Sequence, residues 1–342
     1  MYKQNIVSHV FSSSYGIAST AIAGFGGLFA DAIAGKDGFI ATLIISLTIL
    51  AYGFYKEMKI AKLYKNEIIP IPVVISVDDN TPLDILFKEL VASIARYDKQ
   101  YEALDQKLWS YFGIAKERLL FKYDGDMYNH DRLVSFLQII RHELNNVQQL
   151  LENQVQFHIL FLRRPAIAMA VGSMFRTDGI VVYQNSDHDH KLNRVAKIDS
   201  RKYKEHLETL QHFKLSKELN NLQSKELLLV IQISSHKVNI KHKALRGFSN
   251  VIQMHSLYNG TLPPDDASYQ KDFWVENAQE IYNIVNEYKN SFESITILHS
   301  MPEAIGIILG MSLENYWDIN ILQYDAGDYK SVVRLNKIKY YF

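Results

Sequence analysis

The sequence contains no cysteine, which excludes disulfide bonds and thiolate zinc sites and is typical of proteins in a reducing compartment. It also has no net charge, because 37 lysines and arginines balance 37 aspartates and glutamates. A chain without a basic surplus lacks the general positive field by which proteins attract duplex DNA or RNA. The GxxxxGK[ST] and GxSxG motifs of phosphate-loop NTPases and serine hydrolases are missing as well. We therefore expect neither a duplex nucleic-acid partner nor a cofactor or metal ion.

Two N-terminal stretches, residues 4–30 and 38–55, contain no formally charged residue. A helix rises about 1.5 Å per residue, so roughly 20 apolar residues cross the ~30 Å hydrocarbon layer of a bilayer. We therefore predict two membrane-spanning helices, at about residues 11–33 and 38–55, joined by the turn-forming residues 35–38. The expected structure is a transmembrane hairpin with both chain ends on the same side.

Four lysines, Lys56, Lys59, Lys62 and Lys65, directly follow the second span. By the positive-inside rule they place this side of the hairpin in the cytoplasm. The prediction is a multi-pass protein of the inner membrane that contacts the lipid bilayer and whose soluble domain is cytoplasmic. A cleavable signal peptide is the alternative. It is disfavoured because Lys3 is the only basic residue ahead of the apolar stretch and a second apolar span follows at once.

Small residues recur at four-residue spacing within the first span. Small side chains let the backbones of transmembrane helices approach closely. They either pack only against the second helix of the same hairpin or also contact the hairpins of other copies. The two rows are Ser19, Ala23 and Gly27, and Gly16, Thr20 and Gly24.

One pattern occurs twice in the rest of the chain, at residues 157–172 and 295–310. Each copy has an apolar run, a short polar turn, a proline at the expected helix start, and a helix rich in small residues. Proline is tolerated at the first helical position because that N–H has no partner within the helix. The strand–turn–helix–strand order predicts a parallel sheet covered by helices. We therefore predict an α/β fold with two similar Rossmann-like units, whose strand ends surround a shared cleft.

This repeat sets the expected domain boundaries. Each half should open on an apolar strand, at residues 68–77 in the first and 226–234 in the second. The charged residues 201–225 are predicted to be helical and to join the halves. The expected domains are the hairpin with its basic linker at 1–66, the first α/β half at 67–200 and the second at 201–342.

Polar and cationic residues cluster at the predicted strand ends, where open α/β sheets bind ligands. Arg163 and Arg164 directly precede the helix headed by Pro165, and helix N-termini together with cations bind phosphate. Aromatic rings and hydroxyl groups are also common in ligand sites. The alternatives are a solvated, salt-bridged loop for the arginines and an ordinary turn for residues 234–237. The predicted ligand-binding residues are Arg163, Arg164, Tyr183, Ser234, Ser235, His236, Lys237, Ser300 and Tyr324.

The two proline-headed elements, the second followed by Gln323, Tyr324 and Asp325, resemble the SAVED domain over about residues 67–342. That domain is a fusion of two CARF-like Rossmann units and senses cyclic oligonucleotides made by bacterial CD-NTases or CRISPR polymerases. With a two-span hairpin in front, the chain is similar to the transmembrane-SAVED effectors of CBASS antiphage systems. The resemblance implies a non-enzymatic antiphage effector that binds a cyclic oligonucleotide, such as a cyclic trinucleotide, then self-associates and disrupts the inner membrane.

The alternative function is enzymatic, namely a membrane-tethered hydrolase or ring nuclease that degrades a cyclic oligonucleotide. No nucleophile–base pair can be named in the sequence. Residues 187–190 contain two aspartates and two histidines, but they lack the helical spacing of a hydrolytic metal site. We therefore expect them to form a solvated turn, and we predict that the protein is not an enzyme.

Overall fold

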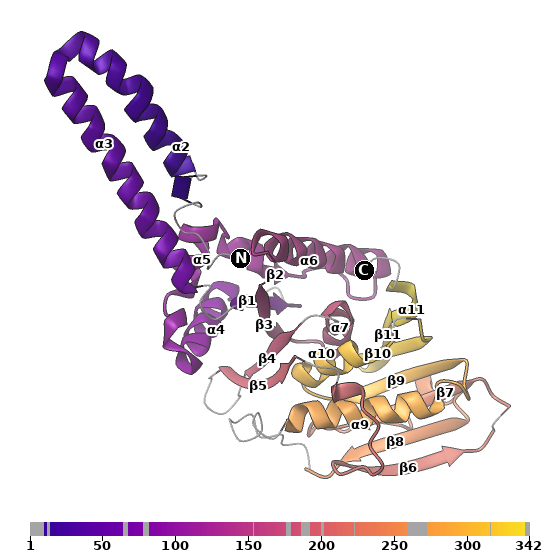
Figure 1. Cartoon of the computed structure of the whole chain (residues 1–342). Helices are drawn as coiled ribbons and strands as arrows, with labels where there is room; N and C mark the ends of the chain where they lie inside the picture. The colour runs from indigo at the N-terminus through magenta and orange to yellow at the C-terminus, as the bar shows by residue number, and fades with distance from the viewer. Residues whose placement is uncertain are drawn as a thin grey trace. The chain divides into compact units, whose positions relative to one another are not determined.

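The structure of the 342-residue chain is a computed structural model (Figure 1). It divides into two compact units, one made of Met1–Ile69 with Lys107–Gly113 and the other of Pro70–Gln106 with Ile114–Phe342. The residues that it describes are 10–11, 14–63, 68–77, 82–152, 154–175, 179–185, 192–199, 202–221, 223–258, 272–314 and 316–338.

The first unit contains a helical hairpin. Its first arm consists of α2 (Ser14–Ala21), a π-helical turn η1 (Ile22–Gly26) and the start of α3 (Gly27–Leu63). Gly35 interrupts α3 with φ 64° and ψ −151°, a conformation that glycine adopts without a steric penalty. The chain reverses there, and the second arm of α3 runs back beside α2 (Figure 1).

Polar and small residues hold the two arms together. The hydroxyl oxygens of Ser19 and Ser46 lie 2.9 Å apart, and each is also within 3.1 Å of the other residue's carbonyl oxygen. Gly53 allows Tyr15 to approach, because a Cβ atom on the glycine would lie 3.0 Å from the tyrosine Cβ. Ser19, from one of the predicted small-residue rows, therefore packs within its own hairpin.

Among the described residues, one helix, Gly35–Ile60, is long and apolar enough to cross a membrane, and 11% of its apolar window is buried. This helix contains the second predicted span. The first predicted span, at about residues 11–33, is divided between α2, η1 and the start of α3. The two glycines within η1 explain why the regular helix breaks there, since glycine lowers helix stability.

The first sheet of the second unit has the strand order β2-β1-β3-β4-β5. The β1–β2 and β3–β4 pairs are parallel, and β5 is an antiparallel edge strand. Every residue of β1 is buried, as expected for a strand covered on both faces. The elements are β1 (Ile69–Ser76), α4 (Leu83–Tyr97), η3 (Lys99–Tyr101), η4 (Lys116–Leu119), β2 (Leu120–Lys122), α6 (His130–Leu150), β3 (Val155–Leu162), α7 (Pro165–Gly172), η5 (Ser173–Phe175), β4 (Ile180–Asn185) and β5 (Leu192–Ile198). Most of α5 (Leu104–Phe112) belongs to the first unit.

The second sheet has the strand order β11-β10-β9-β7-β8-β6. Its four central strands are parallel, and both edge strands are antiparallel to their neighbours. The elements are η6 (Lys202–Lys204), β6 (Phe213–Leu219), β7 (Glu226–Gln232), η7 (Lys243–Leu245), β8 (Asn250–Ser256), α9 (Phe273–Tyr288), β9 (Ser294–Ser300), α10 (Glu303–Ser312), β10 (Ile319–Asp325), β11 (Asp328–Arg334) and α11 (Leu335–Ile338).

The two sheets share one topology apart from β6. The order β11-β10-β9-β7-β8 repeats the order β5-β4-β3-β1-β2, with the antiparallel strand at the same edge. The proline-headed helices take the same place, with α7 joining β3 to β4 and α10 joining β9 to β10. The prediction of an α/β fold with two parallel-rich sheets is confirmed, and both copies of the repeated pattern lie at equivalent positions.

Helices α7 and α10 pack against each other where the two halves meet (Figure 1). A Cβ atom on Gly172 would lie 2.0 Å from the Ile307 carbonyl oxygen, and one on Gly310 would lie 2.0 Å from the Met169 carbonyl oxygen. The two contacts are equivalent under exchange of the halves, because each helix offers a glycine to the backbone of the other. The halves therefore meet across an approximate two-fold axis.

The prediction of a helix at residues 201–225 is wrong. Within the described residues of this segment, η6 is a single 3₁₀ turn, and β6 pairs with β8 along seven residues. Phe213 and Leu215 alternate with lysine and serine, the period of a strand with one solvated face. Charged side chains are common on exposed edge strands because they oppose pairing with other chains.

The substitution Gly172→Ala tests the contact between the two helices. Alanine normally favours a helix over glycine by about 1 kcal/mol, but here its methyl group would overlap the Ile307 carbonyl oxygen. We expect a net loss of about 1–3 kcal/mol, seen as a lower Tm of the purified chain. The control Gly247→Ala places a methyl group that has no described atom within 4 Å apart from its chain neighbours, and its Tm should stay unchanged. Equal Tm values for the two variants would contradict the close approach of α7 and α10.

Candidate functional site

The turn between β3 and α7 carries two arginines in an uncommon backbone conformation. Arg163 has φ 68°, and Arg164 has φ 54° and ψ 75°, so both lie in the left-handed region. A non-glycine residue held there costs of order 1–3 kcal/mol, and such residues concentrate at functional sites. The pair stands at the carboxyl end of a parallel strand and directly before α7. This placement suits the binding of an anion.

Each proline-headed helix is capped by a glutamine from the other half. The Gln184 side-chain oxygen, at the end of β4, accepts a hydrogen bond from the Ala304 N–H in α10 at 3.3 Å. The Gln323 side-chain oxygen, at the end of β10, lies 3.5 Å from the Ala166 nitrogen in α7. The first N–H groups of a helix have no partner within it and bind anions readily. Both halves therefore place strand ends and helix N-termini at one shared site.

An ion pair also joins the halves at this site. Arg164 Nη2 lies 3.2 Å from the Asp325 carboxylate, and both side chains are partly exposed. Tyr128 adjoins the pair, and burial together with the Asp325 charge raises the pKa of its hydroxyl to about 12. The Lys330 ammonium lies 4.8 Å from the centre of the Tyr128 ring. Cationic, anionic and aromatic groups from both halves are therefore close together.

Glu303 adds a carboxyl group at the first turn of α10. Its Oε2 atom lies 3.4 Å from Gln184 Nε2. Burial raises the pKa of Glu303, although Gln184 and Arg163 oppose the shift. The Glu303 carboxyl therefore takes up a proton more readily than an exposed glutamate does, and it could then donate a hydrogen bond to a ligand.

The loop after β7 is held in place by one side chain. Gln232 Nε2 donates hydrogen bonds to the carbonyl oxygens of Ser234 at 2.7 Å and His236 at 2.6 Å. The Ser234 N–H donates to the Ser300 carbonyl oxygen at 2.9 Å, which ties the loop to the end of β9. The side chains of Ser235, His236 and Lys237 are exposed. The predicted loop thus presents its polar groups at the carboxyl end of β7.

The two predicted tyrosines occupy different environments. Tyr183 is 1% exposed, and its hydroxyl lies 2.9 Å from His158 Nδ1, which places the side chain in the core of the first half. Tyr324 is 52% exposed, with its ring centre 5.1 Å from that of Tyr329. Successive side chains of a strand face opposite sides. For that reason Gln184, the neighbour of Tyr183, reaches the shared site instead.

Sequence reasoning missed Gln184, Gln323 and Glu303. A signal was present, because a glutamine occurs near the end of the last parallel strand in both copies of the repeat. Its capping role could not be inferred without knowing that the two helices meet. The histidine- and aspartate-rich residues 187–190 lie outside the described part of the chain.

His299, the residue before Ser300, is buried, and within the part of the chain that the structure describes neither of its ring nitrogens has a hydrogen-bond partner. Burial lowers its pKa to about 4 from the usual 6.5. By strand register, His299 of β9 corresponds to Phe161 of β3 in the first sheet, and Phe161 is a core residue. A polar ring thus replaces an apolar one, at a cost of about 1–3 kcal/mol for unmet polar groups.

His299→Leu should make the protein less sensitive to acid. The unfolded chain takes up a proton on this imidazole near pH 6.5, whereas the folded chain does so only near pH 4. The unfolded state binds more protons in that window, so stability falls as the pH falls from 6.5 to 4. The free energy of unfolding, measured with denaturant, should therefore depend less on pH in the leucine variant. The difference in slope should reach up to about 1.4 kcal/mol per pH unit within this window. The control Phe161→Leu removes no titratable group, and a slope unchanged by His299→Leu would contradict the assignment.

Replacement of Arg164 by glycine and by alanine separates backbone strain from side-chain contacts. Both variants lose the ion pair with Asp325, which is worth about 0–1 kcal/mol at such exposure. Only glycine relieves the left-handed conformation. We expect the glycine variant to be more stable than the alanine variant by about 1 kcal/mol in denaturant unfolding. An alanine variant as stable as the glycine variant would show that the turn is unstrained.

No protein-family model matches the sequence, and no curated protein matches it. Among solved structures, it is similar to the Acinetobacter baumannii Cap4 SAVED/CARF-domain containing receptor with the cyclic trinucleotide 3'3'3'-cAAA, with a TM-score of 0.49 and 12% identity over 89% of this chain. It is also similar to the Moraxella osloensis Cap4 SAVED/CARF-domain containing receptor, with a TM-score of 0.48 and 12% identity over 89% of this chain. The matches span 66% of the length of those two proteins.

Proposed function

We propose that this chain is a membrane-anchored antiphage receptor whose α/β part binds a cyclic oligonucleotide. Binding makes copies associate, and the N-terminal hairpin then disrupts the inner membrane. In this proposal the hairpin and its linker are residues 1–66, and the two α/β halves are residues 67–200 and 201–342. The soluble part faces the cytoplasm, and the receptor itself performs no catalysis in signalling.

The observation that carries the proposal is the convergence of two equivalent helix N-termini beside the strained arginines. Gln184 and Gln323 cap these helices from opposite halves. A cyclic oligonucleotide presents several phosphates around one ring, and a site made from two equivalent halves matches such a ligand. The arginine cations supply what phosphate requires, and the positive ends of the two helices favour a negative charge there.

The remaining residues of the predicted site supply contacts for bases and sugars. Ser234, Ser300 and the exposed ring of Tyr324 lie at strand ends of the second sheet. Base stacking on an aromatic ring contributes about 1–3 kcal/mol per base. Tyr183 is left out of the proposed set because its side chain is in the core. The proposed set is Arg163, Arg164, Ser234, Ser235, His236, Lys237, Ser300 and Tyr324.

The hairpin has an open face on its first arm that suits contact with other copies. Ala23 and Gly24 are exposed, and among the described residues no atom beyond the adjoining backbone of the same helix lies within 4 Å of a Cβ atom placed on Gly24. Small-residue contacts between transmembrane helices are weak on their own. Assembly of the soluble domains would raise the effective concentration of the hairpins, so that weak contacts become populated.

The triple variant Arg163→Ala, Arg164→Ala, Lys237→Ala tests the proposed site. The probe is 3'3'3'-cAAA, and affinity is measured by calorimetry with the full chain in detergent. Each charge-assisted contact to phosphate is worth about 1.5–3 kcal/mol, so the affinity should fall at least 100-fold. The control replaces Lys88, Lys197 and Lys225 with alanine, because these lysines are exposed in α4, in β5 and before β7. Unchanged affinity in a folded site variant would contradict the proposed site.

Ala23→Leu combined with Gly24→Leu tests the effector step. Bulky side chains on the open face should prevent close contact between hairpins while leaving ligand affinity unchanged. We expect ligand-dependent dye release from vesicles that contain the full chain to fall about tenfold or more, because a contact worth about 1.4 kcal/mol is lost. The control Ile44→Leu conserves side-chain volume on an exposed face of α3. Vesicles that contain this control should release as much dye as vesicles that contain the natural chain. Leakage that is equal with and without ligand would instead indicate a passive anchor.

A further inference from the structure

One exposed aromatic side chain differs from the others in its surroundings. Among the described residues outside 1–66, four aromatic side chains are at least 36% exposed, namely Trp109, Tyr258, Tyr316 and Tyr324. Each of the three tyrosines packs against another aromatic ring. Within the same described residues, no ring contact is found for Trp109, which is 62% exposed.

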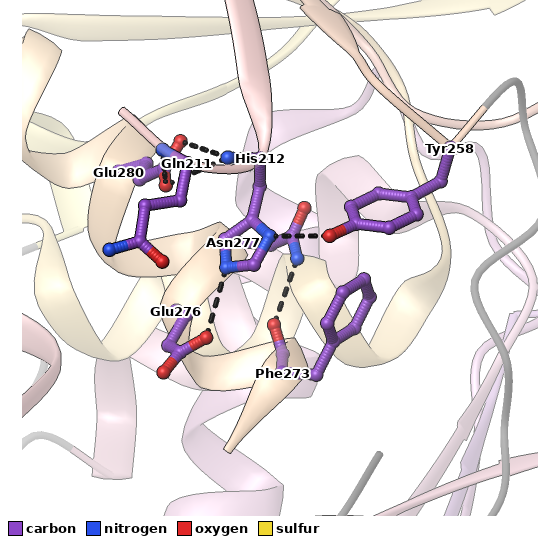
Figure 2. Close-up of polar contacts among 7 residues, drawn as sticks. All are labelled: Gln211, His212, Tyr258, Phe273, Glu276, Asn277 and Glu280. Atoms are coloured by element: carbon purple, nitrogen blue, oxygen red, sulfur yellow. Dashed lines mark hydrogen bonds and ion pairs between the residues drawn. The ribbon is translucent and has the colours of Figure 1, made fainter. Parts of the chain in front are cut away.

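Tyr258 shows how an exposed tyrosine is satisfied within the α/β part (Figure 2). Its hydroxyl lies 3.0 Å from His212 Nδ1, and its ring centre lies 4.7 Å from that of Phe273. His212 Nε2 lies in turn 2.9 Å from the Glu276 carboxylate. The Trp109 side chain, by contrast, makes no hydrogen bond to any residue that the structure describes. Its indole ring and its N–H group are therefore available to a partner outside the chain.

Trp109 lies on α5, a helix with one buried face. Leu104 and Leu108, one turn apart on this face, are at most 1% exposed. At 3.6 residues per turn, Trp109 is about a quarter turn away from Leu108. Gln106 and Ser110 are exposed on the same side of the helix as the tryptophan. The open face of α5 therefore carries one large aromatic ring among small or polar side chains.

The second half of α5 belongs to the same compact unit as the hairpin. This unit comprises Met1–Ile69 and Lys107–Gly113. Figure 1 shows α5 beside the end of α3 that leads into the rest of the chain. The helix that is long and apolar enough to cross a membrane, Gly35–Ile60, ends at this place. Trp109 is therefore close to the level at which a membrane-spanning α3 would leave the bilayer.

Aromatic and cationic side chains mark the same end of the hairpin. Tyr52 and Tyr55 are both more than half exposed. The Lys59 ammonium lies 5.4 Å from the centre of the Tyr55 ring, and Lys56 Nζ lies 3.2 Å from the Tyr15 hydroxyl. Tyrosine, tryptophan and lysine concentrate where the hydrocarbon of a membrane meets water, because their apolar parts and polar tips suit the two phases. These residues indicate the level of the lipid headgroups.

Among the described residues of the first unit, the exposed charge at this end is positive. Lys62 is exposed and Lys107 is partly exposed, whereas Glu57 is buried. Asp105, one turn before Trp109, is partly exposed and interacts electrostatically with Lys116. A cationic surface attracts the anionic phospholipids of a cytoplasmic leaflet. The charge around α5 therefore fits a lipid surface.

We propose that the open face of α5 is a second membrane contact, with the Trp109 ring inserted among the headgroups of an anionic phospholipid surface. The proposal rests on the proposed membrane anchoring by the hairpin and does not depend on the nucleotide site. Tryptophan suits this depth because its ring is apolar while its N–H group can donate to a headgroup or to water. Gln106 and Ser110 are tolerated there because an interfacial helix stays in reach of water.

Brominated phospholipids quench tryptophan emission at short range and therefore report contact between Trp109 and lipid. The full chain is placed in vesicles of phosphatidylcholine and phosphatidylglycerol, with bromine near the headgroup end or near the far end of the acyl chains. We expect stronger quenching by bromine near the headgroups. Trp109→Phe should remove most of the quenching, because Trp274 and Trp317 belong to the second unit and Trp274 is buried. The control Trp317→Phe should keep it.

The absence of cysteine from the chain permits a second measurement that leaves Trp109 unchanged. A nitroxide is attached to Ser110→Cys, next to the tryptophan, and in a matched control to Ser135→Cys, which is exposed on α6. Oxygen concentrates in the bilayer, whereas a nickel chelate stays in water. In vesicles, the label on α5 should collide more with oxygen and less with the chelate than the label on α6.

Vesicle flotation separates this contact from anchoring by the hairpin. A chain that does not float with the vesicles would overturn both claims. A floating chain whose quenching survives Trp109→Phe, or whose two labels are equally open to the chelate, would overturn the contact of α5 and leave the hairpin anchor standing. Emission from Trp109 that is shielded from iodide but not quenched by brominated lipid would indicate contact with a second copy, and would also overturn the lipid contact.

Discussion

The contact between α7 and α10 determines the arrangement of the rest of the α/β part. Gly172 and Gly310 let the two helices touch backbone to backbone, which no side chain larger than hydrogen would permit. Because the helices touch, their N-termini lie within reach of the glutamines that end β4 and β10 in the opposite halves. The repeated topology of the two sheets then brings both sets of strand ends to one site. The proposed binding of a ring-shaped ligand depends on this geometry.

Several energetically unfavourable features gather at this edge of the molecule. Arg163 and Arg164 have left-handed backbones, His299 is buried without a partner, and Glu280 is a buried carboxylate held by N–H groups. The two sheets supply the stability that offsets these costs, since β1 and the centres of β7 and β9 are buried. Proteins retain strain and unmet polar groups mainly where function requires them. Arg163, Arg164 and His299 lie at the carboxyl ends of β3 and β9, which supports a functional site at these strand ends.

The sequence predicted the regular parts of the fold because their signals are local. Apolar strands and the proline-headed helices were placed within a few residues, although Pro302 lies one residue before α10 instead of opening it. The helix predicted at 201–225 was wrong because charge was read as helical, while the two-residue alternation of β6 was overlooked. Tyr183 was predicted at the site because strand ends alone do not tell which face a residue takes. The contacts of His212 with Tyr258 and Glu276 were missed because these residues lie 46 and 64 residues from it in the sequence.

The most direct test of the account is hydrogen–deuterium exchange of the full chain with and without 3'3'3'-cAAA. A ligand held by both halves should slow exchange of the backbone amides at the starts of α7 and α10 together, because it would cover both helix starts and oppose their local opening. Amides in α4, away from the strand ends, should exchange at the same rate in both states. Slower exchange at one helix alone, or no change at either helix at ligand concentrations that saturate binding, would contradict a site shared by the two halves.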